Sequence, residues 1–368
     1  MRLLIIGILV LPQFSLAERW ARPPVDLTSK YSVSKTIENV PRSMSQDGLG
    51  LCYAFTAATM LNIERCRRGN LDCRSLNDDQ LISPLGVARY GGHSENFGDE
   101  DSDWNEINDG GFSSVILSSL KQTGKTPAES CVSLDKVLSK YGGANNSNPE
   151  IEKAQYKIWD DLKAKYSKQK KCDACTADTW ATAVGKEDLN LPPDDSGKPR
   201  SLSAFSQDSY GKALYELLYP KKCSQPENLI EFGKNYAVKE YPQASTKSSY
   251  TDLISKVAEV LTAEPKHPIG IDFCSMEKYK VGDKCNELHS VVITGFRRYC
   301  VSSVKVSAKG SVVPSKDCPN GEAFDLKIQN SWGASWQKAN NDGWIDAKAL
   351  LDSTGYKEKS LTWIEDVK

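Results

Sequence analysis

The sequence has little net charge, few histidines and no long apolar run after its first residues. Its 47 lysines and arginines nearly balance 48 aspartates and glutamates, which leaves a formal net charge of −1. Proteins that bind nucleic acids usually carry a basic excess, so we expect no nucleic-acid partner. Past the amino terminus, no stretch is apolar over the roughly 20 residues that a membrane span needs. The length suits one large domain or two modest ones, no internal repeat is visible, and we expect a monomer.

The amino terminus has the layout of a secretory signal peptide. A basic start is followed by an apolar run over residues 3–11 and by a small-x-small pattern at residues 15–17. A membrane anchor is the alternative, but Pro12 ends the apolar run too early for a span. We therefore expect residues 1–17 to be removed and residues 18–368 to act outside the cell or in a periplasm.

The eleven cysteines are an odd number, so ten could pair in an oxidising compartment and one would remain a free thiol. Three pairs are close enough in sequence to suggest disulfides: Cys66 with Cys73, Cys274 with Cys285, and Cys300 with Cys318. A second group comprises Cys131, Cys172, Cys175 and Cys223, and Cys52 stands alone. The CxxC motif at Cys172 could be a redox dithiol or half a zinc site, although structural disulfides are favoured in an exported chain. The odd thiol, Cys52, is a candidate for chemistry.

Apolar periodicity places the helices early and the strands late. Helices are expected at about residues 51–65, from residue 76, at 113–121 and at 151–171, and strands at 269–273, 290–296 and 324–328. This segregation indicates an α+β fold, with a helical lobe packed against a sheet lobe. The polar stretch at about 135–250 is interpreted as an insertion tied by disulfides.

Cys52 lies in the first turn of the first expected helix, and Gly48 and Gly50 precede it. The helix dipole lowers the pKa of a thiol at this position, and glycine lets the backbone approach a substrate closely. Gln46 could direct its amide at the same point. A thiolate with donors facing a developing oxyanion is what acyl transfer requires. The alternative is that Cys52 is a small buried hydrophobic residue.

A nucleophilic thiol needs a proton partner, and the chain has only three histidines. His93 lies in a Gly-rich acidic loop and His267 precedes a proline, whereas His289 stands directly before an expected strand, which favours His289. Asn330 follows a later strand and could orient the imidazole. Trp332 could shield that hydrogen bond from water. The alternatives are a structural histidine and a structural Trp-Gly turn.

Taken together, these residues resemble the papain family of cysteine peptidases over roughly residues 30–130 and 265–350. The matching positions are Gln46, Gly48, Gly50, Cys52, Ala54, Phe55, His289, Asn330, Ser331, Trp332, Gly333 and Trp336, in the family's order. Asn108–Gly111 resembles the family's Asn-Gly-Gly substrate wall. The resemblance implies a two-lobe fold with a helical left lobe and an antiparallel, barrel-like right lobe, here with an inserted subdomain.

The same resemblance implies the roles of the site residues. Cys52 would attack a peptide carbonyl as a thiolate paired with imidazolium His289, which Asn330 keeps in register. Gln46 and the Cys52 backbone N–H would hold the oxyanion, and the substrate would bind at Gly110, Gly111 and Trp332. Neither a metal nor an organic cofactor is implied.

The sequence departs from the family pattern next to the nucleophile. Leu49 replaces a disulfide-forming cysteine, Leu51 a serine and Tyr53 a tryptophan. None of these changes deletes a catalytic group, so the leading interpretation is a peptidase acting on a peptide or protein substrate. An inactive binding protein and a transamidase of the same fold are the alternatives. Residues 18–45 leave no room for the family's inhibitory prosegment, so we expect the insertion to shield or shape the cleft.

Overall fold

The computed structural model describes the chain in ten segments. They are residues 31–46, 48–91, 105–143, 149–169, 191, 200–244, 246–276, 279–300, 313–314 and 316–367. The expected signal peptide, His93, Cys172 and Cys175 lie outside these segments. Within them, no helix is both long enough and apolar enough to cross a bilayer.

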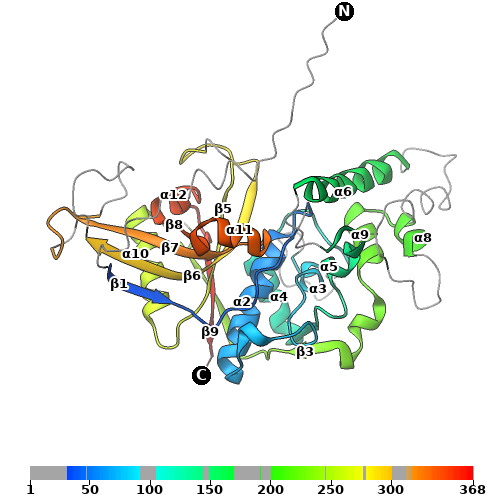
Figure 1. Ribbon diagram of the computed structural model, residues 1–368, viewed down its shortest axis with the longest axis horizontal. Coiled ribbons are helices and arrows are strands. Elements are labelled where there is room, and N and C mark those ends of the chain that lie inside the picture. Colours follow the sequence, from blue (N-terminus) through cyan, green and yellow to red (C-terminus); the bar gives the residue numbers. More distant parts are fainter. Residues whose placement is uncertain are drawn as a thin grey trace, which may run out of the picture.

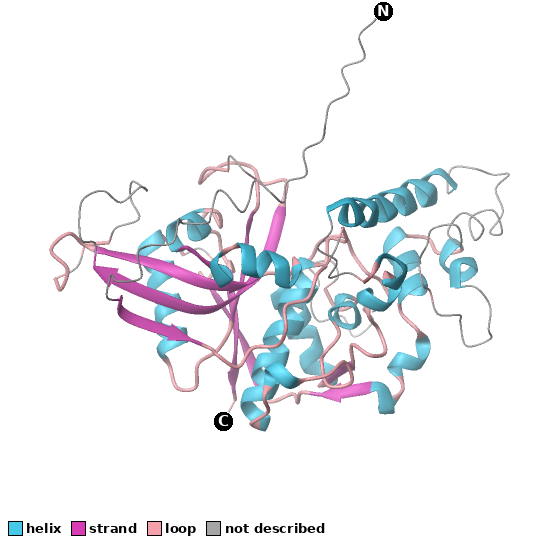
Figure 2. Cartoon of the chain, viewed as in Figure 1, coloured by secondary structure: helices cyan, strands magenta, loops and turns pink. Residues whose placement is uncertain are grey.

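A seven-stranded antiparallel sheet forms one lobe, at the left of Figures 1 and 2. The strand order is β4-β9-β5-β6-β7-β8, and β1 pairs with β6 off this path. The long strand β6 pairs with β5 over residues 288–293 and with β1 over residues 295–299, on either side of a register shift against β7. The strands are β1 (Tyr31–Thr36), β4 (Tyr236–Tyr241), β5 (Ile269–Cys274), β6 (Leu288–Cys300), β7 (Glu322–Gln329), β8 (Trp344–Asp346) and β9 (Leu361–Asp366).

Three helices belong to the sheet lobe and contribute to its core. In α10 (Tyr250–Thr262) the buried residues Leu253, Ile254, Val257 and Leu261 recur at helical spacing and join the apolar cluster of the sheet. A capping box between Ser249 and Asp252 fixes the start of this helix. The shorter helices of this lobe are α11 (Gly333–Ala339) and α12 (Ala347–Asp352).

Helix α2 (Cys52–Gly69) lies between the sheet and the other helices of the helical lobe (Figure 1). This position explains why it is buried on nearly every side. The helical lobe contains α3 (Pro84–Ala88), α4 (Ser113–Thr123), α5 (Leu134–Val137), α6 (Pro149–Gln169), α8 (Arg200–Phe205) and α9 (Tyr210–Leu218). It also has a small sheet of β2 (Lys125–Pro127) and β3 (Leu229–Glu231), and short 3₁₀ turns at Cys73–Ser75, Ser139–Tyr141, Lys221–Ser224 and Pro226–Asn228.

The predicted α+β class, with a helical lobe against an antiparallel sheet lobe, is confirmed. The expected helices at 51–65, 113–121 and 151–171 correspond to α2, α4 and α6, and the three expected strands to β5, β6 and β7. Strand β6 begins earlier than expected, so His289 lies inside it.

The helix expected from residue 76 is wrong, because the chain there forms turns. The side chain of Asn77 accepts a hydrogen bond from the Asp79 N–H (3.0 Å), and Gln80 Oε1 accepts one from the Asn77 N–H (3.2 Å). Such local side-chain bonds compete with helix formation. A short helix starts only at Pro84, after its cap Ser83.

Four disulfides lie in the described residues, and Cys52 is the free cysteine among them. All three pairings expected from proximity are confirmed. The fourth joins Cys131 to Cys223 across 92 residues and so ties the far end of the 135–250 stretch back to its start. Buried side chains of α6 and α9, such as Trp159 and Leu214, belong to the same apolar cluster as α2.

Candidate active site

A pocket of about 370 Å³ lies where the two lobes meet. The helical lobe contributes Cys52, at the first residue of α2, and the loop that carries Gly110 and Gly111. The sheet lobe contributes His289 on β6 and Asp272 on the neighbouring strand β5. The fold therefore brings together a thiol and an imidazole that lie 237 positions apart in the sequence.

The ring of His289 is held in one orientation. Its Nε2 lies 2.8 Å from Asn330 Oδ1, and this oxygen also accepts a hydrogen bond from the Ser331 N–H (2.8 Å). Because the oxygen of Asn330 faces the ring and can only accept, Nε2 carries the proton and donates the hydrogen bond. Nδ1 is then the nitrogen with a free lone pair, which is the requirement for a base.

Trp332 covers the His289–Asn330 pair. Its ring stacks on the imidazole with centroids 4.7 Å apart and an angle of 21° between the planes. Phe273 meets the imidazole edge-on at 5.5 Å. His289 and Asn330 are both buried, so this hydrogen bond is shielded from water and strengthened.

Gln46 lies next to this group without lining the pocket. Its Oε1 accepts a hydrogen bond from the Ser331 hydroxyl (2.5 Å), and its Nε2 donates to the Leu49 carbonyl (3.0 Å). The Gln46 backbone N–H also bonds the Ser331 carbonyl (2.8 Å). One amide N–H of Gln46 is thus used within the turn.

The segment Asn108–Gly111, called the glycine wall below, contacts the turn before Cys52 directly. The Gly110 N–H donates to the Gly50 carbonyl (2.9 Å), and a Cβ at Gly50 would collide with the Asp109 carboxylate. Tyr53 supports the wall from behind, because its hydroxyl donates to the Asn108 carbonyl (3.0 Å). Gly110 has a φ of 99°, in the region that favours glycine.

Leu49 and Leu51, which depart from the family pattern, are both buried in the core of the helical lobe. They therefore stabilise the turn before Cys52 by apolar packing. No side chain of the two lines the pocket.

The expectation that the helix dipole lowers the pKa of Cys52 is wrong for this pocket. Burial first, and then the charge of Asp272, raise the pKa of the thiol to about 12. Burial also lowers the pKa of His289 to about 4, against an opposing effect of its bond to Asn330. Both groups are therefore neutral near pH 7, and a standing thiolate–imidazolium pair is not favoured.

No hydrogen bond joins the Cys52 sulfur to the His289 ring within the described residues. Such bonds are often long before substrate binds and tighten in the complex.

Asp272 is the site residue that the sequence did not reveal. It lies partly exposed in the pocket, and burial raises the pKa of its carboxyl to about 7, while the neighbouring Ser290 hydroxyl opposes the shift. One signal could have found it: a lone acid in the otherwise apolar strand Ile269–Cys274. Because side chains alternate along a strand, Asp272 lies on the face of β5 away from the core residues Ile271 and Phe273.

Of the other histidines, His267 is placed elsewhere. Its Nδ1 lies 2.8 Å from Glu64 Oε1, near the carboxyl end of α2. The structure thus places His289 in the pocket with Cys52 and removes His267 from consideration.

No protein-family model matches the sequence, and no curated protein matches it. Similar solved structures include a recombinant stem bromelain precursor, at 12% identity and a TM-score of 0.41, covering 97% of this chain and 80% of that one. SERA5E from Plasmodium falciparum shows 14% identity, a TM-score of 0.37 and coverage of 88% of each chain. The SERA5 proenzyme from the same organism shows 12% identity and a TM-score of 0.39, covering 89% of this chain and 61% of that one. Overlaps this loose say nothing about activity.

Proposed function

We propose that this protein is an acyl-transfer enzyme that uses Cys52 as its nucleophile, and more narrowly a papain-like peptidase. The observation that carries the proposal is the orientation of His289. Its Nε2–H is fixed on Asn330 beneath Trp332, so Nδ1 is the free base in a pocket that Cys52 also lines. A neutral imidazole is the form that can accept a proton.

The proposed reaction starts with the peptide carbonyl beside Cys52. As the sulfur bonds to the carbonyl carbon, its proton moves to Nδ1 of His289 in the same step, because neither group is charged beforehand. The carbonyl oxygen becomes negative and accepts hydrogen bonds from the Cys52 N–H and the second amide N–H of Gln46.

The imidazolium then returns the proton to the leaving amine, and the C–N bond breaks to leave a thioester on Cys52. Water, deprotonated by the same ring, attacks the thioester, and the sulfur leaves with the proton from His289. Asn330 holds the ring through both steps, which is the function of the third group in such sites.

The long helix α6 supports the further proposal that the 135–250 insertion shapes this site. Tyr156 lies against the turn before Cys52: a Cβ at Gly48 would be 2.8 Å from the Tyr156 Cα. Lys163 Nζ lies 2.9 Å from the Asp109 carboxylate on the glycine wall. This ion pair is exposed and contributes little stability, so its effect would be on the position of the wall.

Labelling of Cys52 by a thiol-reactive epoxide tests the proposed nucleophile. We expect the wild-type protein to be labelled at Cys52, as mapped by mass spectrometry, under mildly acidic reducing conditions. Cys52→Ala should not be labelled, and His289→Ala should be labelled much more slowly, because its thiol has no base. Equal labelling of wild type and His289→Ala would contradict the proposal.

A binding protein with an inactive cleft is the second candidate. The buried Cys52 thiol with its raised pKa favours this candidate, because an un-ionised thiol is a poor nucleophile. It predicts that peptides bind the pocket and are released uncleaved, which mass spectrometry of a peptide library would show.

Export of the chain is compatible with both candidates, the peptidase and the binding protein. Four disulfides are typical of an oxidising compartment, and we propose that the chain is secreted through its amino-terminal segment.

A further inference from the structure

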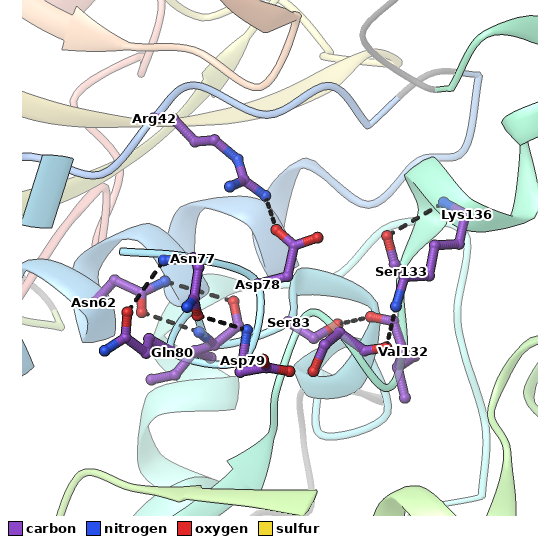
Figure 3. A network of polar contacts seen from close by, with 12 residues as sticks. Arg42, Asn62, Asn77, Asp78, Asp79, Gln80, Ser83, Val132, Ser133 and Lys136 are labelled. Carbon is purple, nitrogen blue, oxygen red and sulfur yellow. Dashed lines mark hydrogen bonds and ion pairs between the residues drawn. The ribbon is translucent and has the colours of Figure 1, made fainter. Parts of the chain in front are cut away.

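A second pocket, of about 280 Å³, lies in the helical lobe and shares no lining residue with the first. Arg42, Asp78, Glu129 and Asp135 provide its charged groups, and Phe55 and Leu85 contribute apolar walls. Figure 3 shows Arg42 extended toward Asp78 from a separate segment of the chain. Nothing in the proposed reaction uses this pocket.

Glu129 is the unusual group in it. The residue is 5% exposed, and its Oε2 has no hydrogen-bond partner within the described residues. Its backbone is held in place by the bond from its N–H to the Leu81 carbonyl (2.8 Å). Burial raises the pKa of the carboxyl to about 8, with the Ser133 hydroxyl opposing. A buried acceptor without a partner is costly, so a ligand that supplies a donor would be stabilised there.

The hydroxyls nearby are largely engaged elsewhere. Ser83 Oγ donates to the Val132 carbonyl and accepts the Gly86 N–H (2.9 Å), as part of the cap of α3. Ser133 Oγ accepts the Lys136 N–H (3.3 Å) at the start of α5, and Figure 3 shows both groups together. The hydroxyls of Ser83 and Ser133 are therefore held in place as helix caps, and Ser133 lines the pocket.

The charge of the pocket favours a cation. Arg42 and Asp78 form an ion pair in which the side chains are 46% and 44% exposed, so these charges offset each other. Among the described lining residues Arg42 is the only cation, so the carboxyl of Asp135 is in excess, joined by that of Glu129 above its pKa of about 8. The apolar walls are suited to a short hydrocarbon chain.

We propose that this pocket binds a small organic cation, a primary ammonium on a short apolar stem. The ammonium group donates to Oε2 of Glu129, and the stem packs against Phe55 and Leu85. Phe55 lies one helical turn after Cys52 on α2, so the ligand would contact the helix that carries the proposed nucleophile. The proposal concerns binding and does not depend on catalysis.

The test compares three probes of equal stem length: n-butylamine, 1-butanol and butyrate, at constant ionic strength and at pH 9, where the Glu129 carboxyl with its pKa of about 8 is ionised. Thermal unfolding of the full chain is measured with each probe. At an amine concentration about ten times its Kd, we expect Tm to rise by roughly 2 °C. An equal rise with butanol, a rise with butyrate alone, or none with the amine would each overturn the proposal.

Variants locate the binding site. Glu129→Gln keeps the shape and removes the charge, so the amine should no longer raise Tm, whereas Glu231→Gln, outside the pocket on β3, should leave the rise unchanged. If Glu129→Gln fails to fold, Asp78→Asn serves instead. Asp78→Asn leaves the charge of Arg42 in the pocket without its ion-pair partner. Because this charge repels an ammonium group, we expect calorimetry to show at least threefold weaker binding of the amine. Cys52→Ala must bind the amine as wild type does, and unchanged binding in Asp78→Asn would overturn the site.

Discussion

The two ends of helix α2 each meet a histidine from the sheet lobe. At the amino end Cys52 shares a pocket with His289, whose ring is bonded to the amide oxygen of Asn330. At the carboxyl end, the ring of His267 is bonded to the buried carboxylate of Glu64, which Arg67 also binds at 2.7 Å. A buried histidine therefore lies at each end of this helix. The ring of one is bonded to a neutral amide and the ring of the other to a carboxylate.

The difference shows how the partner of a buried histidine decides whether a ring nitrogen is left free for a ligand. A neutral amide partner orients the ring of His289 without charging it, and the other ring nitrogen is left facing a pocket. The carboxylate of Glu64 bonds the ring of His267 and also pairs with Arg67, which in turn pairs with Asp366 (2.6 Å). The first arrangement can exchange a proton with a ligand, and the second fixes the two lobes together.

The largest expected difference between the two ends is in activity. His289→Ala should lower kcat/KM for peptide hydrolysis by roughly 1000-fold, because the thiol loses its base. His267→Ala should change it by less than about twofold when the folded fraction is corrected for. Steady-state kinetics on a fluorogenic peptide measure both. Comparable losses would mean that His267 has a role in the chemistry.

Acid should destabilise the His289 end. Its folded pKa of about 4 lies below the unfolded value near 6.5, so the unfolded state takes up a proton first as the pH falls. Stability from this group is present above pH 6.5 and is lost between about pH 6.5 and 4, by roughly 3 kcal/mol.

The measurement is the difference in urea unfolding between wild type and His289→Gln across this pH range. Taking the difference cancels contributions from Asp272 and other acids. A flat difference profile would show that His289 is not held neutral.

The His267 end should respond in stability at constant pH. His267→Ala removes one partner of the buried Glu64 and should cost about 2 kcal/mol in the free energy of unfolding. Adding Glu64→Gln should recover part of this cost, because a carboxylate that has lost its histidine partner is then no longer buried in charged form. Chemical denaturation of the single and double variants tests this, and additive losses would argue against an ion pair.

The smallest expected effect concerns Asp272, the acid beside the thiol. Asp272→Asn removes a charge that raises the pKa of Cys52, so alkylation of Cys52 by iodoacetamide at pH 8 should accelerate by roughly three- to tenfold. The wild-type and variant rates should converge below pH 6, where the carboxyl with a pKa of about 7 is protonated. A constant ratio at all pH values would exclude a charge effect.

Much of the site could be predicted from local sequence. Cys52 follows two glycines at the start of an apolar helix, and His289 and Asn330 adjoin β-branched strands, so each had a local signal. The prediction of a helix from residue 76 was wrong because the side chains of Asn77 and Gln80 accept hydrogen bonds from backbone N–H groups of neighbouring residues, a competition that apolar spacing does not reveal. Asp272 was missed because one acid in a strand has no periodic pattern; its importance comes only from lying next to Cys52.

The sequence alone determined the α+β class, the three short-range disulfides and the choice of Cys52, His289 and Asn330 as candidate site residues, because local spacing and residue type are enough to indicate all of these. The tertiary structure decided which histidine faces Cys52, how Cys131 pairs, and that the thiol and imidazole are neutral. Those properties depend on burial and on neighbours brought from distant segments, and the free energy of a buried charge is set by that surrounding shell. Tertiary packing also left Oε2 of Glu129 without a hydrogen-bond partner among the described residues, in a pocket that no sequence motif indicates.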